Sequence, residues 1–329
     1  MKEGAERGPK ATVVVPMYNA SATVGATLRS LSRQTWMPDE IIVVDDGSTD
    51  NSVEVAREAI EHCGLGGRAR VVSKANGGPA SARNRGIEEA SADSERIMFV
   101  DSDDEVSPLY AEHLLAGATS EEVLPCSRLS HCAAPPEAQE APRREVKTES
   151  YPKPLANAAF LARLREGVIG SACTKAYSLR IIRERGLRFE AEFPEDTRFN
   201  IAYLKHCDSV AVIDAADYFY ISREGSVTAR PDLSLAENYE RIGAELCALT
   251  GEAHRGDVLA FLYPQFRAVA AALACAGHGG ELRALQAMPL AREAFRAYRP
   301  ATLPDRLAHT LLRRGFGRLY KTLFGCRRT

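Results

Sequence analysis

Short apolar runs alternate with stretches of mixed polarity through the first third of the chain. The apolar runs predict buried strands at 12–16, 40–45, 70–73 and 96–100. Between them, apolar positions at helical spacing predict helices at 22–34, 52–62 and 80–90, with Asp50 or Asn51 as the cap of the second. Strands that alternate with helices in this way indicate a parallel sheet joined by right-handed crossovers.

The pattern is weaker after a short helix at 110–115. We expect a surface loop over most of 118–150, with a strand at 123–129 that Pro125 makes less favourable. Further on, the spacing predicts helices at 156–165, 178–185 and 196–206, and short strands at 175–177, 210–213 and 218–221. The core candidates in the helix at 196–206 are Phe199, Ile201, Tyr203 and Leu204.

From residue 234 onward the chain is rich in Ala and Leu, and its periodicity predicts helices at 235–249 and 257–275. We therefore expect three parts: a flexible N-terminus at 1–9, an α/β domain at 10–230 and a helical C-terminal region at 231–329. The boundary between the last two parts is placed near Arg230 and Pro231.

Composition places the 329-residue chain among globular proteins, with 45% hydrophobic and 26% charged residues. No apolar run approaches the ~20 residues of a membrane span, and the charged N-terminus lacks the apolar core of a signal peptide. The eight cysteines form no Cys-x-x-Cys pair, so we expect reduced thiols rather than a zinc site. Together these features predict a cytoplasmic protein.

Charge is distributed unevenly along the chain, whose net charge is −2. The segment 291–329 holds ten Arg or Lys and two acidic residues, and 303–328 alternates basic and apolar residues at helical spacing. This segment is either a basic amphipathic helix lying on the inner face of an anionic membrane or a helix docked on the protein with a solvated basic face. Nucleic-acid binding is not expected, because no aromatic residues are interleaved along an extended basic groove.

Candidate chemistry is concentrated where the predicted strands end. Asp101 and Asp103 follow the strand at 96–100, at the edge where open α/β sheets bind ligands. Carboxylates there suit Mg²⁺ or Mn²⁺ held together with substrate phosphates. A solvated acidic turn is the alternative interpretation.

The first two strands end in polar turns. After the first strand, Tyr18 either faces a nucleotide base or packs in the core. Asn19 and Ser21 are candidate caps for the next helix. After the second strand, Asp45 or Asp46 can accept hydrogen bonds from an imide N–H or a ribose hydroxyl, or can serve only in the turn.

Three later segments also carry candidate groups. The glycine-rich sequence at 76–86 opens a helix suited to anions, where Arg83 or Arg85 could neutralise a diphosphate or remain solvated. Glu195 or Asp196 could act as a general base, or Asp196 could cap its helix. Arg223, in the segment 218–228, could reach the phosphates or belong to an edge strand and turn.

The order and spacing of these six segments resemble the family 2 glycosyltransferases, which have the nucleotide-sugar-binding GT-A fold. The resemblance covers residues 10–230 and implies a mostly parallel, mixed α/β sheet flanked by helices, with the helical region as an appendage. It departs from the family pattern over 118–150, and the helices beyond 231 match no motif.

The resemblance implies a role for each matching position. The nucleotide base and ribose would be bound by Pro16, Tyr18, Asp45 and Asp46. Arg83 would lie near the ribose or diphosphate, Asp101 would hold the ribose or sugar, and Asp103 would bind the Mg²⁺ or Mn²⁺ ion. Asp196 would be the general base, with Glu195 as its neighbour or stand-in.

The resemblance also implies inverting transfer of a sugar from a nucleotide-sugar, a UDP-sugar above all, to a carbohydrate or lipid-linked glycan acceptor in polysaccharide or glycoconjugate synthesis. A nucleotidyltransferase is the alternative enzyme, but its Gly-rich, Lys-bearing loop is absent after the first strand. A non-catalytic nucleotide-sugar-binding or scaffold protein would lack Asp103 or Asp196, and both are present. A dinucleotide oxidoreductase is disfavoured because no Gly-x-Gly-x-x-Gly follows the first strand.

Overall fold

The computed structural model describes residues 8–133, 146–222 and 232–324, and it divides into two compact units. The sheet unit consists of residues up to 154, 169–191 and 195–223. The helical unit consists of 155–168, 192–194 and the chain from 224 onward. The segments 155–168 and 192–194 interrupt the sheet unit in sequence but belong to the helical unit, and the sequence does not predict this. The predicted boundary at 230–231 lies outside the described residues.

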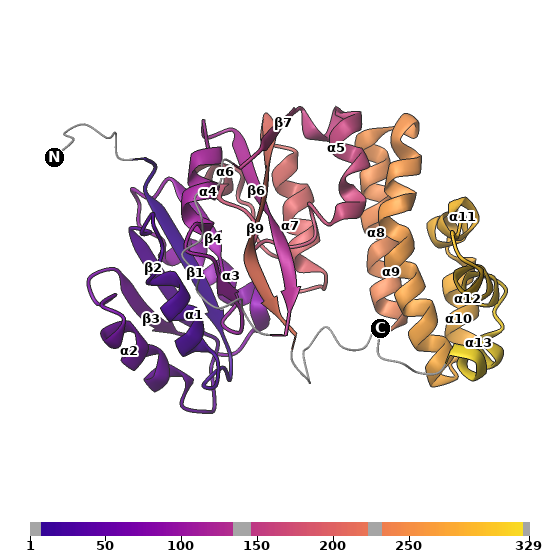
Figure 1. Ribbon diagram of the computed structural model, residues 1–329, viewed down its shortest axis with the longest axis horizontal. Helices are drawn as coiled ribbons and strands as arrows, with labels where there is room; N and C mark the ends of the chain where they lie inside the picture. Colours follow the sequence, from indigo (N-terminus) through magenta and orange to yellow (C-terminus); the bar gives the residue numbers. More distant parts are fainter. Residues whose placement is uncertain (1–7, 134–145, 223–231, 325–329) are drawn as a thin grey trace. The chain divides into compact units, whose positions relative to one another are not determined.

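The main sheet has five strands in the order β3-β2-β1-β4-β8 (Figure 1). Their bounds are β1 Ala11–Met17, β2 Glu40–Asp45, β3 Ala69–Ser73, β4 Arg96–Phe99 and β8 Tyr177–Ser178. The first four are parallel and β8 is antiparallel to β4. The connecting helices are α1 Val24–Leu31, α2 Ser52–His62 and α3 Gly78–Glu89. The predicted alternation of strands and helices is therefore confirmed.

A second sheet contains β5 Glu105–Val106, β6 Val123–Cys132, β7 Thr148–Pro152 and β9 Ser209–Ile221. Two predictions are wrong here. The two short strands expected at 210–213 and 218–221 are one strand, and the loop expected over most of 118–150 contains the start of β7 and a β6 that continues past residue 129. Strand β9 remains continuous because β5 and β7 pair with it antiparallel and β6 pairs with it parallel. Pro125 is tolerated because β6 lies at the edge of this sheet.

Three further helices complete the sheet unit: α4 Tyr110–Gly117, α6 Leu179–Arg185 and α7 Glu195–Leu204. Helix α6 ends as predicted at Gly186, whose φ of 62° suits a residue without a side chain. All four core candidates of α7 are buried. The seven described cysteines form no disulfide with one another, and Cys326 lies outside the described residues.

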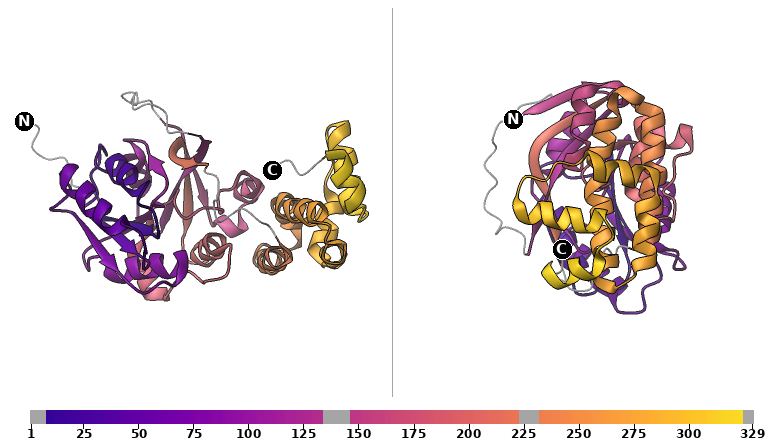
Figure 2. Two further views of the ribbon diagram at one scale, coloured as in Figure 1. Left: turned by 90° about the horizontal axis from the view of Figure 1, so that it is seen from below. Right: turned by 90° about the vertical axis from the view of Figure 1, so that its right-hand side faces the viewer.

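The helical unit contains α8 Leu233–Thr250 and α9 Arg255–Ala276, which lie side by side (Figure 2). The shorter helices are α5 Ala158–Ala162, α10 Gly279–Ala287, α11 Pro289–Ala297, α12 Leu303–Arg313 and α13 Gly317–Phe324. The helix predicted at 156–165 is only α5 followed by a 3₁₀ turn, Leu164–Glu166.

Helix α9 contacts most other helices of its unit. Contrary to expectation, the segment Glu252–Ala276 is long and apolar enough to cross a membrane, with a mean hydropathy of 1.5. In its most apolar window 61% is buried in the protein, so it has the character of a core helix.

Gly86 brings α3 against the main sheet, because a Cβ atom built there would lie 2.3 Å from Cγ1 of Val14. We expect Gly86→Ala to lower the free energy of unfolding by about 1–2 kcal/mol, since overpacking outweighs the better helix propensity of alanine. Urea unfolding followed by circular dichroism measures this. Gly25→Ala in α1 is the matched control, since its Cβ would meet Val55 at an ordinary 3.9 Å. Equal or greater stability of Gly86→Ala would contradict the close approach.

Candidate functional site

The loops that follow β1, β2 and β4 lie together at the carboxyl edge of the main sheet. Asn19, after β1, accepts a 2.8 Å hydrogen bond through Oδ1 from the backbone N–H of Thr49, after β2. The hydroxyl of Thr23 donates a 2.8 Å bond to the carbonyl of Ser102, after β4. The predicted site segments at the ends of these three strands are therefore neighbours.

Asp50 joins the first two loops. Its carboxylate accepts hydrogen bonds from the backbone N–H groups of Ser52, at 3.0 Å, and Ser21, at 3.2 Å, and from the Ser52 hydroxyl. The bond from that hydroxyl is the main reason why the pKa of Asp50 falls to about 2. The caps expected for α1 are wrong: Thr23 occupies the cap position, and Asn19 and Ser21 bond to the neighbouring loop instead.

The residues predicted to bind the nucleotide base and ribose differ in their exposure to solvent. The Tyr18 side chain is 51% exposed, which excludes its packing in the core. Pro16 is buried within β1 opposite Val44. Asp45 is buried and accepts a 3.0 Å bond from the Ser48 backbone N–H through Oδ1. Tyr18 thus offers an open ring, and Asp45 a second carboxylate oxygen, near the ends of adjacent strands.

Asp46 has a structural role that the sequence leaves open. Its buried carboxylate accepts hydrogen bonds from the backbone N–H groups of Gly77, at 3.1 Å, and Gly78, at 2.7 Å. Lys74 donates a further 2.6 Å bond. Because these N–H groups belong to the start of α3, the anion at this helix N-terminus is the chain's own carboxylate.

The acidic turn after β4 contains one buried and one exposed carboxylate side by side. Asp104 is buried and accepts a 2.7 Å bond from the Tyr218 hydroxyl and a 2.9 Å bond from the Ile221 backbone N–H. Burial raises the pKa of Asp104 to about 7, although both hydrogen bonds oppose the rise. Asp103 is exposed. The Tyr218 oxygen also accepts a 3.2 Å bond from the Asp101 N–H, so the side chain of this β9 residue holds the turn after β4 in place.

Arg83 lies at the centre of a cluster of three carboxylates and is 4% exposed. Its Nη2 donates a 2.8 Å bond to Asp101 Oδ1, and its Nη1 donates a 2.8 Å bond to Glu195 Oε1. Nη1 also lies 3.2 Å from Asp196 Oδ1. Burial alone would lower the pKa of Arg83, but Asp196 and Asp101 lead the charges that raise it well above its usual range. The cluster joins the β4 turn to the start of α7.

Asp196 is the carboxylate in this cluster with the features of a base. Its side chain is 17% exposed, and burial raises its pKa to about 6 against the opposing effect of Arg83. Oδ2 accepts a 2.9 Å hydrogen bond from the Ala172 backbone N–H. Oδ1 is buried and accepts no hydrogen bond among the described residues, although Arg83 is close. The carboxylate is thus held in place by Arg83 on one oxygen and by the Ala172 N–H on the other, and it does not act as a simple helix cap.

Asn84, the residue after Arg83, fixes the position of an aromatic side chain that lies beside the cluster. Asn84 forms two hydrogen bonds with the backbone of Phe189, through its amide group at 2.8 Å and its oxygen at 2.9 Å. The Phe189 ring then stacks on Phe199, with centroids 3.9 Å apart, and lies 5.5 Å from the guanidinium carbon of Arg83. Arg85, two positions along α3, instead forms a partly exposed pair with Glu89 at 2.5 Å.

Three residues of this arrangement have no predicted role, namely Asp104, Tyr218 and Ala172. Asp104 and Tyr218 lie inside motif segments of the sequence, but nothing in their residue type distinguishes a structural role from a ligand-binding one. Ala172 acts through its backbone and leaves no sequence signal. Arg223 lies outside the described residues.

The donor set at the acidic turn fits a hard divalent cation. In the described part of the chain, no three His, Cys, Asp or Glu side chains are grouped to hold a metal ion by themselves. Mg²⁺ is commonly bound by one or two carboxylates together with substrate phosphates. Asp103, exposed on a turn that Asp104 anchors, would supply one such oxygen ligand, and Asp101 lies two positions away with its side chain 32% exposed.

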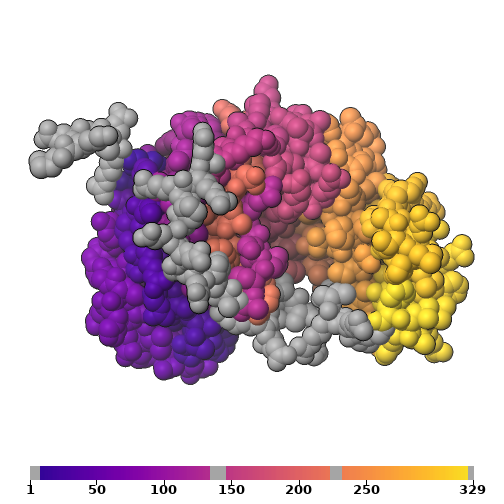
Figure 3. All heavy atoms as spheres, viewed as in Figure 1, coloured from indigo at the N-terminus to yellow at the C-terminus, as the bar shows by residue number. Residues whose placement is uncertain are grey.

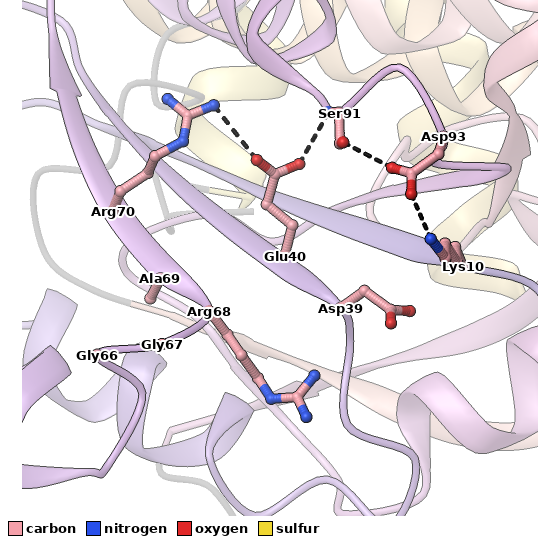
Figure 4. Close-up of a pocket in the computed structure, with 10 residues that line it drawn as sticks. All are labelled: Lys10, Asp39, Glu40, Gly66, Gly67, Arg68, Ala69, Arg70, Ser91 and Asp93. Carbon is pink, nitrogen blue, oxygen red and sulfur yellow. Dashed lines mark hydrogen bonds and ion pairs between the residues drawn. The ribbon is translucent and has the colours of Figure 1, made fainter.

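A hollow of about 490 Å³ lies at the opposite, amino edge of the same sheet (Figure 4). Its charged side chains mostly pair with one another: Arg70 with Glu40 at 3.3 Å, and Lys10 with Asp93. Ligands of open α/β sheets bind at the carboxyl ends of the strands, so this hollow is separate from the candidate site.

Comparison with known proteins shows a family and a fold. Residues 12–184 match the model of Glycosyl transferase family 2. EpsJ of Bacillus subtilis, described as an uncharacterized glycosyltransferase, is 31% identical over 232 residues, which cover 68% of this chain and 64% of EpsJ. The chain covers between 32% and 66% of the length of the first three curated relatives that it matches.

Two solved structures share the fold. TarS 1–349 of Staphylococcus aureus in complex with UDP-GlcNAc has a TM-score of 0.63 at 21% identity, covering 93% of this chain and 91% of that one. A mannosyltransferase from Pyrobaculum calidifontis in complex with GDP-Man and Mn²⁺ has a TM-score of 0.58 at 16% identity, covering 97% and 88%. The predicted GT-A fold with a helical C-terminal region is confirmed.

The central place of Arg83 can be tested with Arg83→Met. We expect the free energy of unfolding to fall by about 3–5 kcal/mol at pH 8, because three carboxylates lose their shared cation. Without that cation the folded-state pKa of Asp196, already raised to about 6 by burial, rises further above its unfolded value, so stability falls as pH rises and the deficit is smaller at pH 5. Urea unfolding at both values measures it. Arg85→Met is the control, with an expected loss of about 0.5 kcal/mol. A deficit independent of pH would contradict the electrostatic role.

Proposed function

Because this chain belongs to glycosyl transferase family 2, we propose that it transfers a sugar from a UDP-sugar to an acceptor hydroxyl with inversion at the anomeric carbon. The observation that carries the proposal is the Arg83 cluster. A single guanidinium links Asp196, a carboxylate with a raised pKa, to Asp101 on the acidic turn of the donor side. A base and a donor-binding turn are thereby held within the span of one side chain.

The donor would bind along the carboxyl edge of the main sheet. The exposed Tyr18 ring can stack on the nucleotide base, while Asp45 can accept a hydrogen bond from the base or ribose. Asp101 would contact the ribose or sugar, and Asp103 would hold a Mg²⁺ or Mn²⁺ ion. When bound, that ion supplies positive charge that stabilises the departing diphosphate.

Asp196 would activate the acceptor. The acceptor hydroxyl gives its proton to the Asp196 carboxylate while its oxygen forms a bond to the anomeric carbon, and the bond from that carbon to the diphosphate oxygen breaks on the opposite face. The Ala172 N–H keeps the carboxylate oriented through Oδ2. A base with a pKa near 6 is largely ionised at neutral pH and still accepts a proton readily.

The choice of donor is supported by likeness alone. TarS was crystallised with UDP-GlcNAc, whereas the mannosyltransferase was crystallised with GDP-Man, so both nucleotides belong in a first screen. We also propose that the acceptor is a carbohydrate or a lipid-linked glycan, which would place the reaction in polysaccharide or glycoconjugate synthesis.

The first experiment is nucleotide release from a panel of UDP- and GDP-sugars with Mg²⁺ or Mn²⁺. We expect metal-dependent release from one UDP-sugar, and loss of that release in Asp103→Ala, since the diphosphate then leaves without its cation. Asp93→Ala, at the amino edge of the sheet, is the control and should keep the wild-type rate.

The same screen separates the alternatives. Nucleotide-sugar binding, seen as thermal stabilisation, without release in the presence of any acceptor would indicate a binding or scaffold protein. Release of pyrophosphate from a nucleoside triphosphate and a sugar phosphate would indicate a nucleotidyltransferase. Either result would overturn the proposal.

The role of Asp196 predicts a pH profile. We expect kcat/KM for transfer to fall about tenfold per pH unit below the pKa near 6, because the protonated carboxyl group cannot accept the acceptor's proton. Asp196→Asn should lose about 10²–10⁴-fold in kcat while its affinity for the donor is retained. Asp208→Asn, an exposed acid just after α7, is the control. Full activity of Asp196→Asn would exclude it as the base.

A further inference from the structure

Helices α12 and α13 carry a stripe of large apolar side chains that the helical unit leaves exposed. Both helices pack on α9, and the residues buried on them include Ala308, Leu311, Leu312 and Tyr320. Their other faces and the turn between them expose a set of apolar residues, each 44–78% exposed, namely Leu303, Leu307, Phe316, Leu319 and Leu323. We call these five residues the apolar stripe. Figure 3 shows these C-terminal helices, in yellow, at the surface.

Helical spacing places each part of the stripe on one side of its helix. Leu303 and Leu307 are four residues apart in α12, as are Leu319 and Leu323 in α13, so each pair lies on one helix face. Both helices contact α9, and the stripe residues are exposed while Leu311, Leu312 and Tyr320 are buried, so the stripe lies off the packed face of each helix. Large apolar side chains exposed in groups of this kind are typical of interaction surfaces.

Five exposed basic residues accompany the stripe and have no ion-pair partner in the described part of the chain. They are Arg306, Arg313, Arg314, Arg318 and Lys321. Elsewhere in the same unit, arginines do find acids: Arg255 pairs with Glu293 at 2.9 Å, and Arg241 with Glu192 at 3.0 Å. Asp305, the acid within α12, is engaged by Arg267 at 3.1 Å. Positive charge thus remains uncompensated where apolar surface is exposed.

We propose that α12 and α13 dock the protein on an anionic lipid surface. The stripe would enter the boundary between headgroups and acyl chains, and the basic residues would meet anionic headgroups. A nucleic acid could satisfy the charges, but it offers no apolar interior to cover five large side chains. A lipid surface satisfies both features together. This inference is independent of the proposed function, because docking needs no catalysis.

The test is cosedimentation of the full chain with vesicles of phosphatidylcholine alone or mixed with phosphatidylglycerol. We expect binding to the mixed vesicles, weakened by salt, and little binding to phosphatidylcholine alone. Arg313→Gln with Arg314→Gln should weaken binding about tenfold or more, since each basic residue near the surface contributes. The charge-matched control is Arg29→Gln with Arg57→Gln, at exposed positions on α1 and α2.

The apolar part has its own pair of variants. Leu319→Ser with Leu323→Ser should weaken binding about tenfold or more, because buried apolar area is lost. Leu249→Ser, at an exposed leucine of α8, should bind like the wild type. Circular dichroism and thermal unfolding of each variant show whether it is folded.

Several results would overturn the proposal. One is absence of binding by the wild type to mixed vesicles, and another is equal binding by the stripe variants. A third is a monomer–oligomer equilibrium, seen by analytical ultracentrifugation, that the stripe variants abolish without vesicle binding, since the stripe would then join two copies. A large loss of thermal stability in Leu319→Ser with Leu323→Ser would instead show that the protein itself covers the stripe.

Discussion

The guanidinium of Arg83, buried among three carboxylates, is the interaction on which the site depends. Its partners come from two segments: Asp101 follows β4, and Glu195 and Asp196 begin α7, with Glu195 lying 112 positions after Arg83 in the sequence. Burying three carboxylates without a shared cation would cost several kcal/mol, so the cation is a condition for bringing these segments together. Asn84 and the ring of Phe189 hold that cation in turn. Asp196 and the acidic turn after β4 therefore occupy fixed relative positions.

The carboxylates of the carboxyl edge fall into two physical classes. Asp46, Asp50 and Asp104 accept backbone or hydroxyl hydrogen bonds that shape the loops. Asp103 is exposed at the acidic turn, and Asp196 is held by Arg83 and the Ala172 N–H; these are the two acids to which the proposed function gives ligand contacts. The first group would support the second, because a loop fixed by its own hydrogen bonds presents the neighbouring side chain without further loss of entropy.

The sequence predicts the parallel strands and their helices well because each strand is an unbroken apolar run between turn residues. It misplaces β9, since the polar residues Asp214 and Asp217 interrupt the apolar pattern that long-range pairing with three other strands keeps continuous. Asp217 is buried there with Ser107 and His113 as partners at 2.5 and 2.8 Å. At the site, residue types and strand ends predict which acids gather. Which of these acids shape the loops and which face a ligand depends on contacts between residues far apart in sequence, and no local sequence pattern reports such contacts.

The charge balance of the Arg83 cluster bears on both the proposed base and the proposed donor site. Three carboxylates surround a single guanidinium, so the cluster keeps an excess of negative charge even when Arg83 is fully paired. That excess, acting with burial, raises the pKa of Asp196 despite the nearby cation. A divalent cation bound beside Asp101 and Asp103 would oppose that rise, whereas the diphosphate of a donor carries negative charge of its own. Under the proposed function, donor binding and the ionisation of Asp196 would therefore be coupled through one electrostatic field.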